Sequence, residues 1–105
     1  MSAKRYRHTD VPSIFQGDVP DGEEIDFVTG LQCDCDFHHV MNGAYKHKAE
    51  QDGFWVWLTR EHHDRLHNTP EGIEYQKSLK AKCQENYERH HTREQWMKRY
   101  KKNYL

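Results

Sequence analysis

The sequence predicts an α+β fold in which two strands and a short helix form the centre, two longer helices follow, and the N-terminal segment is irregular. Three observations support this prediction. The apolar run 54–58 follows the turn signal Asp52-Gly53, as a strand often does. Threonines suited to helix capping precede the three segments with helical patterns, at Thr59, Thr69 and Thr92. The 105 residues leave room for one domain with a modest core.

The irregular segment is expected at residues 1–24, which are acidic and contain two of the three prolines. Residues 25–105 are expected to form the domain, with a core at 36–68 and a helical extension at 69–105. This division follows the change from turn-rich to periodic sequence.

The first part of the domain carries strand and turn signals. Residues 25–28 and 36–40 have the short apolar pattern of strands, and residues 42–48 are predicted to form a polar loop. The first helix is predicted over 60–66, directly after Thr59.

The two C-terminal helices have stronger signals. Thr69-Pro70-Glu71 combines a capping residue, a proline at the first helical position and an acid in the first turn. A stripe expected to face the core follows at intervals of four, at Tyr75, Leu79, Cys83 and Tyr87. Thr92 and Gln95 fit a capping box, and the last helix has Trp96, Met97 and Tyr100 on one side.

Composition argues against a membrane or secreted protein. The longest apolar run has five residues, which is too short to span a bilayer, and residues 1–10 lack the apolar core of a signal peptide. Three cysteines are an odd number, so we expect reduced thiols and a cytoplasmic location.

The spacing of four of the nine histidines indicates a metal site. His38 and His39 are adjacent and point in different directions from a strand, whereas His63 and His67 share one face of a helix. Three converging imidazoles can hold a divalent cation, and a fourth beside them can take a proton from water. This is the arrangement that a small, one-metal phosphodiesterase acting on nucleic acid needs.

The segment HHVMNGAYKHKAEQDGFWVWLTREHHDRLH resembles the HNH, or ββα-metal, nuclease core. The resemblance covers roughly residues 26–105 and is closest to small bacteriophage proteins, sometimes grouped with recombination-enhancing nucleases. The ending MKRYKKNYL is also similar to the ends of those proteins, and the histidine spacing matches nuclease colicins. The resemblance implies a ββα-metal core with two additional C-terminal helices, encoded by a phage or prophage and acting in the cytoplasm of a bacterial host cell.

The resemblance also implies roles for individual residues. His39 would be the general base, and His38, His63 and His67 would hold one divalent metal ion, which could be Mg, Mn, Ni or Zn. The middle Asn of HNH, which braces the loop that holds the base, has no clear counterpart. Asn42 and Asp52 are the available substitutes.

A second departure concerns the structural zinc that many members of this family bind through two Cys-x-x-Cys knuckles. The corresponding positions here are residues 26–29 and 59–62, which contain no cysteine, so we expect this zinc to be lost. An improvised site made of Cys33, Cys35 and His62 is the less favoured alternative.

DNA is the expected partner, together with a second copy of the chain or another phage protein. Basic residues that flank the histidines or end the chain could contact phosphates, namely Lys46, Arg60, Arg65, Lys98, Arg99, Lys101 and Lys102. From charge alone, a solvated helix face is the favoured explanation of the basic tail.

Three hypotheses follow from different classes of function. The leading one is an HNH-type endonuclease that cuts DNA in recombination, replication or packaging. The alternative is a catalytically eroded module that binds DNA or a protein, which the missing Asn and the altered knuckles suggest. The third is a histidine-rich metal-binding module without a nucleic-acid role, which the basic C-terminal region disfavours.

Overall fold

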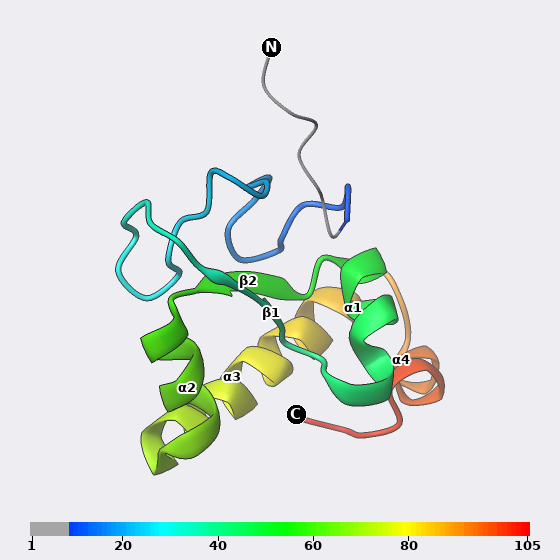
Figure 1. Cartoon of the computed structure of the whole chain (residues 1–105). Helices are drawn as coiled ribbons and strands as arrows, with labels where there is room; N and C mark the ends of the chain where they lie inside the picture. The colour runs from blue at the N-terminus through cyan, green and yellow to red at the C-terminus, as the bar shows by residue number, and fades with distance from the viewer. Residues whose placement is uncertain (1–8) are drawn as a thin grey trace. The chain divides into compact units, whose positions relative to one another are not determined.

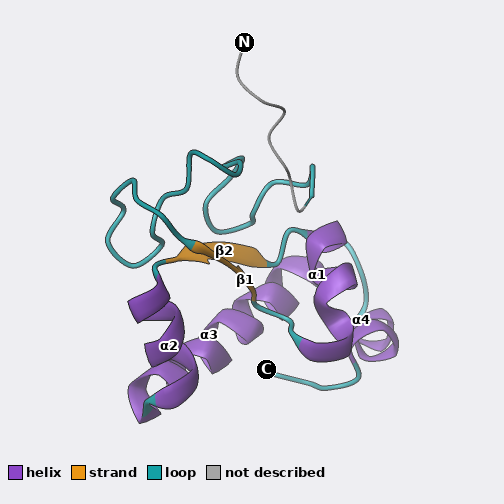
Figure 2. Cartoon of the chain, viewed as in Figure 1, coloured by secondary structure: helices purple, strands orange, loops and turns teal. Residues whose placement is uncertain are grey.

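The computed structural model describes residues 9–105, and this part of the chain is α+β, with four α-helices and one two-stranded antiparallel sheet (Figures 1 and 2). The predicted α+β class is therefore confirmed. The first unit of the chain ends at Asp64 and the second spans Arg65–Leu105. None of the helices in the described range is both long and apolar enough to cross a membrane.

The sheet of the first unit pairs β1 (Asp36–His39) with β2 (Trp55–Leu58), so that His38 lies opposite Val56 and His39 opposite Trp55. All four residues of β2 are buried, as its apolar sequence predicts. The strand predicted at residues 25–28 is wrong, because Ile25 makes only an isolated bridge to Gln32. The Asp26 carboxylate accepts a hydrogen bond from the Thr29 amide and closes a turn there.

The polar loop predicted at 42–48 is also wrong. A 3₁₀ turn, η1 (Gly43–Tyr45), leads directly into helix α1 (Lys46–Asp52), which lies beside β1 (Figure 1). Helix α1 buries only Ala49, and its other residues are exposed or half-buried. This exposure explains why the sequence of the segment is polar. Gly53 ends the helix with φ of 77°, and a Cβ there would collide with the Pro12 carbonyl oxygen.

Residues 9–35 have neither helix nor long strand, yet they are tied to β2 (Figure 2). Ser13 Oγ donates to the Trp55 carbonyl at 2.5 Å, and Gln16 Oε1 accepts from the Trp57 amide at 2.7 Å. The Phe27 amide donates to the Trp57 carbonyl at 2.8 Å. The irregular segment thus satisfies the edge of β2 that β1 leaves open.

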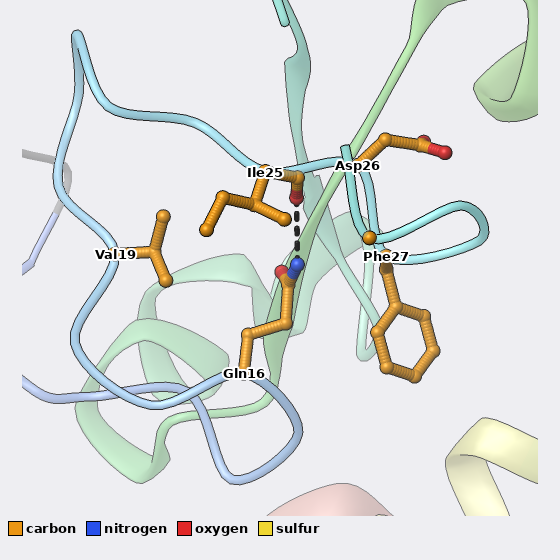
Figure 3. A pocket seen from close by; sticks show the side chains of 6 residues that line it. Gln16, Val19, Ile25, Asp26 and Phe27 are labelled. Atoms are coloured by element: carbon orange, nitrogen blue, oxygen red, sulfur yellow. Dashed lines mark hydrogen bonds between the residues drawn. The ribbon is translucent and has the colours of Figure 1, made fainter. Parts of the chain in front are cut away.

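A pocket in this segment is lined by Gln16, Val19, Ile25, Asp26, Phe27 and Gly30 (Figure 3). The Gln16 amide is engaged at both ends, because Nε2 donates to the Ile25 carbonyl at 2.6 Å and Oε1 accepts from Trp57. The Asp26 carboxylate points away from Val19 and Ile25 (Figure 3). The lining therefore offers no convergent polar groups for chemistry.

Helix α2 (Arg60–Asn68) follows β2 in the chain. Two further helices come after it, α3 (Pro70–Tyr87) and α4 (Arg93–Tyr100). The predicted caps are confirmed: Thr69 accepts from the Gly72 amide, and Thr92 forms a full capping box with Gln95. The predicted stripe on α3 holds only at its middle, where Leu79 and Cys83 are buried while Tyr75 is 40% exposed.

The stripe fails at its first residue, Tyr75, because a spacing of four overshoots the helical repeat of 3.6 residues, whereas Tyr87 at its end is half-buried. Each step of four residues drifts by about 40°, so positions two steps apart no longer share a face. On α4, Trp96 and Tyr100 are buried and their rings lie 4.4 Å apart.

The end of the chain is anchored within the second unit. The side chain of buried Gln84 accepts from the Tyr104 amide at 2.6 Å and donates to Asn103 Oδ1 at 2.8 Å. Trp96 Nε1 donates to the Lys102 carbonyl at 2.7 Å. The basic tail is thus held against α3 and α4 by its backbone.

Candidate metal centre

Three of the four predicted site histidines meet in space. His38 comes from β1, and His63 and His67 lie one turn apart on the continuous helix α2. One ring nitrogen from each lies within 4.8 Å of the others. Metal–imidazole bonds of about 2.0–2.1 Å place ligand nitrogens about 3.4 Å apart in a tetrahedral shell, so a small approach of the rings would let the three histidines hold a metal ion. Among residues 9–105, this is the one group of His, Cys, Asp or Glu that meets this condition.

The three rings differ in their access to solvent. His38 is buried, with 2% of its surface exposed, and its ring centre lies 5.1 Å from that of His63. His63 is half-buried and His67 is exposed. The group is therefore buried at His38 on the strand and exposed at His67 on the helix.

Asp36 orients one of these ligands. Its carboxylate oxygen Oδ2 lies 3.0 Å from Nδ1 of His63 and 3.3 Å from Nε of Arg60. Because Nδ1 of His63 faces Asp36, Nε2 is the nitrogen that a metal would use, as in carboxylate–histidine–metal arrangements. The sequence prediction missed Asp36, although it lies two residues before His38 and so shares its face of the strand.

His39 lies outside the group of three. Alternation along β1 places it on the face of Phe37, whose ring centre is 4.9 Å away. Its Nε2 lies 2.7 Å from Oε2 of Glu50 on α1, and both side chains are partly buried. The structure thus brings His39 to a carboxylate rather than to the other histidines.

Glu50 was missed because residues 42–48 were expected to be a loop, which hides the helix that carries it. The two predicted bracing residues lie elsewhere. Asn42 is the N-cap of η1, where its side chain makes no capping hydrogen bond, and Asp52 is the last residue of α1. The group that contacts His39 directly is therefore Glu50.

The positions that correspond to the zinc knuckles come together around the Asp26 carboxylate. Its side chain is fully buried and accepts from the amides of Thr59 at 3.0 Å and Thr29 at 2.9 Å. Nδ1 of His62 lies 3.0 Å from Oδ2 of Asp26 and 3.0 Å from the Thr59 hydroxyl. This hydrogen-bonded cluster, the Asp26 cluster, ties the 26–29 turn to the start of α2, which carries His63 and His67.

The hydrogen bonds of the Asp26 cluster also favour the ionised form of the Asp26 carboxylate. Burial alone would raise the pKa of Asp26, but hydrogen bonds from Thr59, His62 and Thr29 outweigh it and lower the pKa below its ordinary value. Cys33, Cys35 and His62 do not form a three-ligand group in the described residues.

Replacing Asp26 by Ala is expected to lower the free energy of unfolding by on the order of 3 kcal/mol at pH 7, because buried donors lose their acceptor. The loss should shrink as the pH falls below about 4. A group with a lowered folded-state pKa contributes its full stability above the unfolded-state pKa, and that contribution is lost as the pH falls through the folded-state pKa. Urea unfolding at pH 7 and pH 3, with the exposed Asp34→Ala as control, measures both effects. An Asp26 variant as stable as the control would contradict this role.

The predicted phosphate-binding residues are dispersed. Lys46 and Arg60 are the first residues of α1 and α2, and Arg65 lies on the exposed side of α2. Arg60 is paired with Asp36, although its side chain is 76% exposed.

The basic residues of the tail surround aromatic rings. Arg99 lies 5.7 Å from the ring centre of Tyr100, and Lys102 lies 5.5 Å from that of Tyr104. Lys98 is in the last turn of α4, and Lys101 caps that helix with φ of 67°. Two cations of the tail, Arg99 and Lys102, therefore lie beside aromatic rings.

Comparisons with protein-family models, with curated proteins and with solved structures find no match for this chain. The functional assignment therefore depends on the residues and their geometry.

Proposed function

We propose that the protein is a divalent-metal-dependent endonuclease of the HNH type, which hydrolyses phosphodiester bonds in DNA. The observation that carries the proposal is the convergence of His38, His63 and His67, with ligand atoms within 4.8 Å of one another. The three histidines come from β1 and α2, and the order β1, β2, α2, with η1 and α1 inserted between the strands, supports a ββα-metal core. A phage or prophage enzyme of recombination, replication or packaging fits the resemblance of the sequence.

Each residue has a distinct task in this proposal. His38, His63 and His67 bind one divalent ion, and Asp36 holds His63 in the required orientation. When bound, the ion supplies Lewis-acid stabilisation of the charge on the phosphate and on the leaving 3′-oxygen. His39 takes a proton from the attacking water, and Glu50 orients its imidazole.

The donor set limits which metal fits. Three imidazoles suit borderline ions such as Ni and Zn better than Mg, which prefers oxygen ligands. We propose that no structural zinc binds at residues 26–29 and 59–62. The hydrogen bonds of the Asp26 cluster connect these two segments instead.

Glu50→Gln is expected to reduce cleavage by about 10–100-fold, by analogy with the loss caused by removing groups that orient metal-bound histidines. Metal affinity should not change, because His39 is not one of the three ligands. The loss should appear in kcat rather than in KM, because the imidazole acts in the chemical step. Glu61→Gln on the exposed face of α2 is the control. A wild-type kcat in Glu50→Gln would contradict the positioning role.

Neutralising the tail by K98Q, R99Q, K101Q and K102Q is expected to flatten the salt dependence of DNA binding. The slope of log K against log salt should fall by about 0.9 for each phosphate that the tail no longer neutralises, for all sequences alike. Lys80 and Lys102 both lie 5.5 Å from the Tyr104 ring, where a phosphate would relieve their mutual repulsion. Burial and then the charge of Lys102 lower the pKa of Lys80.

Fluorescence titrations at several salt concentrations measure this slope. The control replaces Lys77 and Lys82, two exposed lysines of α3, by Gln. An unchanged slope in the tail variant would show that the tail is a solvated helix end.

The second candidate is a catalytically eroded HNH-fold module that binds DNA or a protein partner. The contact between His39 and Glu50 favours it, because His39 is held apart from the three histidines. Nicking and gel-shift measurements on the same plasmid separate the two candidates. An endonuclease converts supercoiled to open-circular DNA, whereas a binding module shifts the DNA without cutting it.

A further inference from the structure

Two thiols face each other in the loop that leads into β1. The sulfur atoms of Cys33 and Cys35 lie 3.9 Å apart, with Cys33 exposed and Cys35 half-buried. Each thiol also points to a backbone carbonyl, Cys33 to that of Leu31 and Cys35 to that of Cys33, both at 3.4 Å. The two side chains are thus held on the same side of the loop.

Their separation matches a shared cation better than a disulfide. Two thiolates on a tetrahedral zinc ion, each bonded at about 2.3 Å, lie about 3.8 Å apart. A disulfide requires the sulfur atoms to approach to about 2.05 Å. The pair therefore needs almost no movement to chelate an ion, and a large one to oxidise.

The charge around the thiols also favours a cation. Residues 21–36 contain six acids and neither Lys nor Arg. Burial, the Cys33 thiol and the carboxylates of Asp26 and Glu24 raise the pKa of Cys35 to about 12. The same negative charges that oppose a bare thiolate attract a divalent ion, whose binding releases the thiol protons to solvent.

We propose that Cys33 and Cys35 chelate a thiophilic divalent ion of the zinc class, at a site separate from the three histidines. The two thiolates supply half of a tetrahedral shell, and water completes it. His62 is not the third ligand in this arrangement, because within residues 9–105 its ring nitrogens and the two sulfurs do not form a group of neighbouring ligand atoms. The site does not depend on the proposed nuclease activity.

Titration of the full chain with Cd²⁺ under a phosphine reductant tests the proposal through the thiolate-to-metal charge-transfer absorption. Wild type is expected to develop this band with one equivalent of ion, and C33S and C35S are each expected to lose it. Cys83→Ala, at a buried thiol, should keep the band, and so should H63A/H67A. Apparent affinity should rise by about tenfold or more per pH unit between pH 6 and 8, because at least the Cys35 proton is displaced.

Three results would overturn the proposal. They are the absence of a thiolate band in wild type, a band of equal strength in C33S and C35S, and a band lost in H63A/H67A. The last would place the ion at the histidines. Circular dichroism of each serine variant checks that loss of the band does not reflect loss of the fold.

Discussion

Replacing His63 and His67 together by Ala is expected to abolish divalent metal binding at the histidine group and, with it, DNA cleavage. Two of the three ligands are removed, and the loss should exceed the roughly 10–100-fold caused by changing groups that only orient a ligand. Helix α2 should persist, because Ala is the best helix former. Calorimetry at pH 7 in a C33S/C35S background should show about one site per chain when the histidines are intact, weakening below about pH 6, because ligating histidines must be neutral.

The matched control removes two exposed histidines away from the group, His47 and His90. It should bind metal as wild type does. Calorimetry in a background of C33S/C35S keeps the thiol pair from contributing heat. Unchanged affinity in H63A/H67A would remove the histidine site from consideration.

His39→Ala is expected to abolish cleavage while metal affinity stays nearly intact. Loss of a general base typically lowers the rate by about 10²–10⁴-fold. The metal is unaffected in this account because His39 is not one of the three grouped ligands and lies beside Phe37 and Glu50 instead. Single-turnover nicking rates and calorimetry on the same preparation measure both quantities.

The role of His39 as general base requires that His39→Ala lowers the cleavage rate without lowering the metal affinity. Equal cleavage by wild type and variant would reject His39 as the base. A parallel fall in metal affinity would instead make it a ligand or a structural residue.

The parts of the fold with local signals were predictable. The capping box of Thr92 and Gln95 is confirmed because a cap depends only on residues three apart. The apolar run before Thr59 is confirmed as β2, because few other elements bury four consecutive residues. Helix α1 was missed because seven residues with one buried side chain leave no periodic signal.

The convergence of three histidines was also predictable, from one strand position and one helical spacing. The sequence could not predict which carboxylates contact the histidines of this region. Glu50 and His39 are 11 residues apart, and Asp26 and His62 are 36 apart. Periodicity tells which face a side chain occupies but not which distant residue lies opposite, so these partners emerge only from the tertiary structure.

Nicking of a supercoiled plasmid by metal-free protein, with and without added Mg²⁺, Mn²⁺, Ni²⁺ or Zn²⁺, tests the central claim most directly. The account predicts open-circular product with at least one of these ions, none with a chelator, and recovery when the ion is added back. It also predicts no product from His39→Ala or from H63A/H67A under the same conditions. Intact supercoiled plasmid with every ion, while calorimetry shows the histidine site filled, would contradict an endonuclease and leave the binding module as the function of this fold.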